Sequence, residues 1–175
     1  NEGGDKDLWV SRVFASPHTA GKAFVCKSGY RNDDFYPYVF KTTDFGQSWE
    51  LINNGLIHAP VNAIVEDPQK EDLLFLGSDK GLYVSFDDGK QWMKMNNNMP
   101  EALVKDIKIQ KNQSDIVLAT YGRGAYIADI WPLENYNNEI TNEDLFFFPV
   151  QNKPQRNYSQ RAGWGNYEMT GDNYL

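Results

Sequence analysis

Short apolar stretches recur along the first 133 residues, each bounded by Gly, Pro, Asn or Asp. Stretches rich in β-branched and aromatic side chains, with turn residues about every 8–12 positions, predict short β-strands and exclude a helical repeat. They fall into three aligned sets. The leading strands are VSRVFASP (10–17), VNAIVEDP (61–68) and VKDIKIQK (104–111). The second strands are KAFVCKSG (22–29), DLLFLGSD (72–79) and DIVLATYG (115–122), and the third strands open YVFKTTDFGQSWELI (38–52), LYVSFDDGKQWMKM (82–95) and AYIADIWPL (125–133).

The sets repeat at a nearly constant interval. Val61 and Val104 are 43 residues apart, and so are Gly77 and Thr120. The first two leading strands are 51 residues apart, so eight extra residues lie before Val39, in GYRNDDFYP. A period in the forties with four strands per unit is typical of a β-propeller blade, whereas a β-sandwich gives no reason for a constant period.

We therefore expect an all-β fragment of a larger β-propeller, with about two and a half blades, each a four-stranded antiparallel sheet. The blades occupy 1–133, with repeats near 10–60, 61–103 and 104–133, and 134–175 forms an irregular tail leading towards a following domain. The third unit is incomplete, because its third strand runs into WPL instead of a turn and a Trp. The later run DLFFFPV is expected to supply a strand or to pack on the blade edge.

Two sets carry the motif S/T-x-D-x-G-x-x-W after the third strand. In a tight hairpin the Asp can accept hydrogen bonds from its own turn, the hydroxyl can bond locally, and Gly permits a positive φ. The Trp can pack a large apolar surface on the neighbouring sheet. The predicted structural residues are Thr42, Asp44, Gly46, Trp49, Ser85, Asp87, Gly89 and Trp92. The two Asp residues lie on separate blades, whereas glycosidase carboxylates lie about 5–10 Å apart, so we assign no catalytic residues.

This motif, twice at the blade period, resembles that of the Asp-box (BNR-repeat) β-propellers. The segments RNDDFYPYVFKTTDFGQSWE, PVNAIVEDPQKEDLLFLGSDKGLYVSFDDGKQW and VKDIKIQKNQSDIVLATYGRGAYIADIWPL are most similar to the C-terminal blades of large bacterial sortilin-like proteins with glycosyl hydrolase BNR repeats. The resemblance implies further blades before Asn1, more chain after Leu175, and export to the periplasm, the cell surface or the medium. A sialidase of this superfamily needs an arginine cluster and a Tyr nucleophile with a Glu partner, which are not evident here.

Blade topology divides the loops between two ends of the sheets. The motif turns share one end with the loops between first and second strands, and the insertion falls at the other end, where irregular loops are the expected ligand side. The candidate binding residues there are Arg31, Asp33, Asp34, Tyr36 and Arg123. The insertion could instead be a solvated loop in which Asp33 or Asp34 pairs with Arg31. For Arg123 two roles stay open, because it could clamp a ligand carboxylate or pair with a neighbouring blade.

Charge and composition narrow the partners. The chain of 175 residues has a formal net charge of −7, which disfavours nucleic acid. No apolar stretch is long enough for a membrane helix. The single cysteine, Cys26, lies in an apolar run and is expected to be a buried thiol. His18 and His58 have no second ligand at metal-binding spacing, so we expect no metal and no cofactor.

The sequence leaves three functions open. The first is a non-catalytic recognition or scaffold module of a secreted or surface protein that binds protein or glycan. The second is part of a glycoside hydrolase of the sialidase or xyloglucanase kind, by fold analogy. The third is a sortilin-like peptide receptor. Two and a half blades cannot close a ring, so the outer sheets of this piece would expose apolar faces. The piece alone should therefore dimerise, aggregate or remain associated with the rest of its parent chain.

Overall fold

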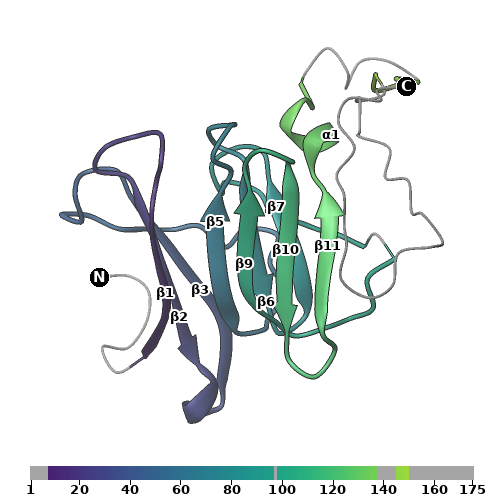
Figure 1. Cartoon of the computed structure of the whole chain (residues 1–175). Coiled ribbons are helices and arrows are strands. Elements are labelled where there is room, and N and C mark those ends of the chain that lie inside the picture. Colours follow the sequence, from purple (N-terminus) through teal and green to yellow (C-terminus); the bar gives the residue numbers. More distant parts are fainter. Residues whose placement is uncertain (1–7, 97, 138–144, 150–175) are drawn as a thin grey trace, which may run out of the picture. The chain divides into compact units, whose positions relative to one another are not determined.

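A computed structural model describes residues 8–96, 98–137 and 145–149. The chain divides into two compact units, Asn1–Tyr136 and Asn137–Leu175. The first unit holds the strands and one short helix of each kind (Figure 1). In chain order its elements are β1 (Trp9–Ala15), β2 (Ala23–Gly29), the 3-10 helix η1 (Tyr30–Asn32), β3 (Asp34–Thr42), β4 (Glu50–Leu51), β5 (Val61–Glu66), β6 (Leu74–Ser78), β7 (Gly81–Ser85), β8 (Met93–Lys94), β9 (Val104–Gln110), β10 (Asp115–Thr120), β11 (Ala125–Asp129) and α1 (Trp131–Glu134).

Three antiparallel sheets follow one another along the chain. The first sheet has the order β1-β2-β3-β4, the second β5-β6-β7-β8, and the third β9-β10-β11. Each sheet is therefore a simple meander that starts from its leading strand, and the all-β prediction is confirmed. The described part of the third sheet has three strands, and α1 follows β11 where the other sheets turn into a fourth strand. Residues 145–149, which include most of the run DLFFFPV, form no strand.

The sheets pack face to face, and β5 contacts both β1 and β9 (Figure 1). We call the face of each sheet that is turned towards the preceding sheet its leading face, and the opposite face its trailing face. Between the first and second sheets the buried core consists of Phe24, Cys26, Val39, Ile52, Val61, Ile64, Leu74, Leu76, Tyr83 and Trp92. Between the second and third sheets it consists of Ala63, Val65, Leu73, Phe75, Leu82, Val84, Val104, Ile107, Ile116, Leu118 and Ile130. The second sheet is covered on both faces, which is why its strands read as continuous apolar runs.

The strand register corrects the alignment of the second strands. Gly77 pairs with Ala63. The residue 43 positions after Ala63 is Asp106, which pairs with Ala119. The counterpart of Gly77 is therefore Ala119 and not Thr120, because the β9–β10 turn is one residue shorter than the β5–β6 turn and the β10–β11 turn is one residue longer than the β6–β7 turn. A slip of one residue moves a side chain to the other face of a sheet, so this correction decides which face each residue occupies.

The insertion lengthens the connection between β2 and β3, where the spacing predicts it. Lys27 pairs with Tyr38 across this connection, and Gly29 pairs with Asp34 beyond an irregularity in the register. The description of Gly29–Pro37 as a loop is wrong for its second half, since β3 begins at Asp34. The insertion is thus a short 3-10 turn on an extended hairpin.

A repeated hydrogen bond joins the leading strands of consecutive sheets. Each leading strand has a β-bulge near its start, and the extra residue is Ser11 in β1, Asn62 in β5 and Lys105 in β9. The Ser11 hydroxyl donates to the carbonyl of Val61 at 2.9 Å, and the Asn62 amide donates to the carbonyl of Val104 at 3.0 Å. The bulge residues of β1 and β5 therefore each direct a donor to the first residue of the next leading strand, whereas the Lys105 ammonium in β9 donates back to the amide oxygen of Asn62 at 3.0 Å.

Candidate functional site

The two repeated motif turns make matching hydrogen bonds. Asp44 accepts from the backbone N–H of Ser48 at 2.9 Å and from its hydroxyl at 2.6 Å, and the Thr42 hydroxyl donates to Asp44 at 2.8 Å. These bonds, with the Ser48 bonds dominant, lower the pKa of Asp44 to about 2. Gly46 has a φ of 85°. The second motif repeats the pattern through Ser85, Asp87, Gly89 (φ 84°) and Gln91.

The two motif tryptophans differ in their surroundings. Trp92 is 2% exposed, and its indole N–H donates to the carbonyl of Ile52 in the first sheet at 2.7 Å. Trp49 is 43% exposed and donates to Gly46 of its own turn. The expected packing on a neighbouring sheet therefore holds for Trp92 and not for Trp49.

At the opposite end of the first sheet, η1 and the start of β1 form a pocket of about 270 Å³. Its lining residues are Leu8, Trp9, Val10, Ser28, Gly29, Arg31 and Asn32. The Arg31 guanidinium carbon lies 5.5 Å from the centre of the Trp9 ring, a cation–π arrangement. Tyr30 and Phe35 make an edge-to-face contact beside it, with ring centres 6.0 Å apart. Sequence reasoning missed Trp9, because its place opposite the insertion becomes apparent only from the β1–β2 register.

The structure places the predicted binding residues in several different environments. Arg31 lines the pocket, while Asp33 is the exposed left-handed residue that ends η1, with a φ of 55°. The Asp34 carboxylate accepts from the Tyr38 hydroxyl at 2.7 Å and from the backbone N–H of Tyr36 at 3.0 Å. Within the described residues no ion pair joins Arg31 to Asp33 or Asp34, so the pair that the solvated-loop alternative included is not formed, and the solvated loop itself stays a prediction.

The other two candidates lie away from the pocket lining. The Tyr36 ring packs against Tyr38 and His58, with ring centres 5.0 Å and 5.5 Å apart. Arg123 is exposed in the β10–β11 turn of the third sheet, between Gly122 and Gly124, whose φ angles are 75° and 74°. The pocket therefore brings together Arg31 with Trp9, and not Arg31 with Arg123.

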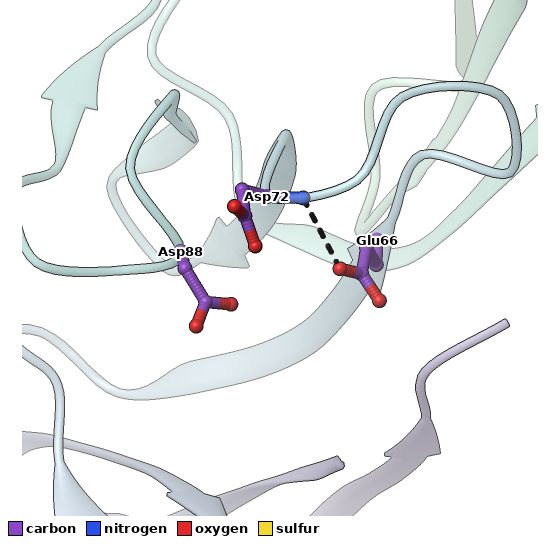
Figure 2. Close-up of side chains that lie close together, drawn as sticks. All are labelled: Glu66, Asp72 and Asp88. Atoms are coloured by element: carbon purple, nitrogen blue, oxygen red, sulfur yellow. Dashed lines mark hydrogen bonds between the residues drawn. The ribbon is translucent and has the colours of Figure 1, made fainter. Parts of the chain in front are cut away.

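A partly buried charge cluster lies at the motif end, between the first and second sheets. Figure 2 shows the carboxylates of Glu66, Asp72 and Asp88 close together. The Lys22 ammonium lies 2.8 Å from Glu66, 3.0 Å from Asp72 and 2.8 Å from Asp88, and Lys41 lies 3.0 Å from Asp88. Burial lowers the pKa of Lys22, but its hydrogen bonds to these carboxylates outweigh that effect and hold the pKa above its ordinary value.

This cluster is structural in its chemistry. Three carboxylates at such spacing form the donor set of a cation site, and the Lys22 ammonium supplies that cation from the neighbouring sheet. Sequence reasoning missed the cluster, although the loops that carry it were all assigned to the same end of the sheets. To predict the cluster, it would also have been necessary to know that the β1–β2 loop, which carries Lys22, lies against the second sheet.

Consecutive four-stranded meanders that pack face to face, with their leading strands adjacent, define β-propeller blades. Solved structures with this fold support that class. An ancestral GH74 enzyme matches 70% of this chain at 22% identity with a TM-score of 0.57, and the chain covers 14% of its length. The GH74 enzyme of Niastella koreensis matches 69% at 15% identity with a TM-score of 0.55, and 21% of its length is covered. YCF48 bound to D1 peptide matches 73% at 15% identity with a TM-score of 0.50, and 38% of its length is covered.

At these identities the similarities establish the β-propeller fold alone. The chain spans well under half of each matched structure. No family model and no curated protein matches the sequence. In the portion of the chain that the structure describes, no helix is long and apolar enough to cross a membrane.

Proposed function

We propose that this chain is a non-catalytic recognition module, part of a larger Asp-box propeller exported to the periplasm, the cell surface or the medium. Its ligand is a protein segment or a glycan, bound at the pocket between β1 and η1. The observation that carries this proposal is the Arg31–Trp9 contact in the pocket wall.

The chemistry of this end suits a ligand with both polar and flat apolar groups. Trp9 is 64% exposed and Tyr30 is 61% exposed, so both rings offer surface to a sugar face or an aliphatic side chain. Among the described residues, Arg31 has no recorded hydrogen bond or ion pair, which leaves its planar donors available for an acceptor. A peptide ligand agrees with the matched YCF48 structure, which is bound to a peptide.

Binding to a glycan array and a peptide array tests the proposal, with the whole chain as the probe. For any ligand found, Trp9→Ala and Arg31→Gln should each weaken binding by about tenfold or more, as expected of aromatic and arginine anchors. Trp49→Ala is the matched control, because Trp49 is also partly exposed but lies at the motif end. A ligand whose affinity falls with Trp49→Ala and not with the other two changes would place recognition elsewhere.

The glycoside hydrolase alternative rests on the carboxylates of Asp33 and Asp34 beside the pocket, and on the GH74 enzymes among the matched structures. Incubation with a panel of polysaccharides, followed by mass spectrometry, would detect released sugars. Release that stops with Asp33→Asn or Asp34→Asn would establish an enzyme and overturn the non-catalytic proposal. Release that survives both changes would also overturn it, and would assign the chemistry to other carboxylates.

A further inference from the structure

The short helix α1, which follows the third sheet, is attached to the β5–β6 turn of the second sheet. The Lys70 ammonium donates to the carbonyl of Leu133 at 3.1 Å and also to that of Tyr136. The Gln69 amide donates to the Glu134 carboxyl group at 3.2 Å. Leu133 packs on the core between the second and third sheets. The chain that leaves β11 is therefore docked on the second sheet through side chains of this turn.

A buried acceptor without a donor lies beside these contacts. Asp67, the first residue after β5, is 0% exposed. Its Oδ1 atom accepts from the backbone N–H groups of Gln69 at 2.7 Å and Lys70 at 2.8 Å, which shapes the turn. Its Oδ2 atom is buried and has no hydrogen-bond donor among the described residues. Because a buried polar atom without a partner is costly, a donor is expected at this point.

The Glu134 carboxyl group lies within hydrogen-bonding reach of the Asp67 carboxyl group. The Glu134 Oε2 atom accepts from the Ser114 hydroxyl at 2.6 Å, and Oε1 accepts from the Gln69 amide. Two ionised carboxylates in this contact would repel each other, and neither would have a proton to donate. One proton between them turns the contact into a hydrogen bond and supplies the donor that Asp67 Oδ2 lacks.

The surroundings favour Glu134 as the carrier of this proton. Burial is the largest cause that raises the pKa of Glu134, and the negative charge of Asp67 raises it further, while the hydrogen bond from Ser114 opposes them. The Asp67 carboxyl group already has two backbone donors on its other oxygen, so it is suited to accept a third hydrogen bond.

The other charged groups around the pair do not replace the proton. Lys70 attracts both carboxyl groups electrostatically, but its ammonium is bonded to carbonyls of α1 and its vicinity. Within the part of the chain that the structure describes, neither Asp67 nor Glu134 takes part in an ion pair. From the β1–β2 loop, the His18 ring contacts the backbone carbonyl of Asp67 at 2.7 Å. From the β9–β10 turn, Lys111 presents its carbonyl to the Gln69 amide at 2.9 Å.

We propose that Glu134 carries a proton that it donates to Asp67 Oδ2, and that this carboxyl–carboxylate hydrogen bond makes the docking of α1 on the second sheet dependent on pH. When Glu134 ionises, repulsion between two like charges replaces the bond. Docking is therefore complete below pH 4.5, the ordinary pKa of Glu134, and weakens as the pH rises through its raised pKa. The loss is about tenfold for each pH unit between the two values.

Carbon-13 NMR of the side-chain carboxyl groups of the whole chain, from about pH 4 to 9, tests the shared proton. Glu134 should titrate above its ordinary pKa, and Glu134→Gln identifies its signal. In Asp67→Asn the new amide donates to the Glu134 carboxylate without a shared proton, so the pKa of Glu134 should fall. The Asn oxygen can keep the two backbone bonds of the turn. An ordinary pKa for Glu134, or a raised one that Asp67→Asn leaves unchanged, would overturn the proposal.

Hydrogen exchange tests the docking itself. The backbone N–H groups of Glu134 and Asn135 are bonded within α1 to Ile130 and Trp131. Their exchange, corrected for the pH dependence of a free peptide, should become faster with rising pH in the wild-type chain. It should stay constant in Glu134→Gln, whose amide supplies the donor at every pH. Equal acceleration in both proteins would show that α1 loosens for another reason and would also overturn the proposal.

Glu101→Gln is the matched control. Glu101 is about half exposed and lies 2.8 Å from the Lys80 ammonium, whose hydrogen bond lowers the pKa of Glu101. Removing this carboxylate should therefore leave the exchange of α1 and the titration of Glu134 as in the wild-type chain. Circular dichroism of each variant confirms that the fold is retained.

Discussion

Removing the Lys22 ammonium should weaken the junction between the first and second sheets. The side chains of Lys22 and Glu66 are 4% and 0% exposed, so their pair is almost fully desolvated. Asp72 is half-exposed and contributes little, and Asp88 keeps Lys41 as a partner. Lys22→Met therefore leaves chiefly Glu66 as an uncompensated buried charge, and should lower the free energy of unfolding by about 3–5 kcal/mol.

Urea unfolding of the whole chain measures this change, followed by both fluorescence and circular dichroism to check that the transition has two states. The matched control is Lys80→Met. Lys80 also lies 2.8 Å from a carboxylate, that of Glu101, but both side chains are about half exposed, so its loss should be much smaller than that of Lys22→Met. The double change Lys22→Met with Glu66→Leu should cost much less than Lys22→Met alone. Equal losses for the two lysine variants would refute the argument that burial makes this cluster important.

Three further outcomes follow from the same sheets. Gly89→Ala should destabilise the chain by about 1–3 kcal/mol more than Gly46→Ala. Both glycines have nearly the same positive φ, but a Cβ at Gly89 would lie 2.6 Å from the Ile52 side chain. Equal losses in urea unfolding would contradict this. Burial raises the pKa of Cys26 to about 12, so its thiol should resist alkylation near neutral pH until the chain unfolds; rapid modification of folded protein would show that the thiol is accessible. The lowered pKa of Asp44 adds stability that is present above pH 4 and lost as pH falls towards about 2, so the advantage of wild type over Asp44→Asn should shrink in that range, and a constant difference would be inconsistent with it.

The fold was predictable because the repeat is visible in the sequence itself. Apolar periodicity and the 43-residue interval predict the strands and their grouping into sheets. The faces of the second strands were not predictable, because spacing alone does not show that the β9–β10 turn is one residue shorter and the β10–β11 turn one residue longer than in the second sheet. An alignment that matches Gly77 with Thr120 places each second-strand side chain on the wrong face, and strand pairing is needed to correct it.

The candidate site was predictable only in part. The length of the insertion predicted where an irregular connection lies, and Arg31 lines the pocket there. Trp9 could not be assigned, since its contact with Arg31 depends on the pairing of β1 with β2. The role of Asp34 as a binding residue stays a prediction, and the sequence does not show that its carboxylate accepts a hydrogen bond from the Tyr38 hydroxyl.

The bulge bonds of Ser11 and Asn62 have an evolutionary consequence. Each of these side chains recognises a backbone carbonyl of the following sheet, and every residue type carries that acceptor. A substitution in one leading strand therefore need not be matched by a substitution in the next to preserve this bond. Genes encoding such sheets can be duplicated, deleted or exchanged with this part of the junction intact, while loops such as the β2–β3 insertion diverge independently.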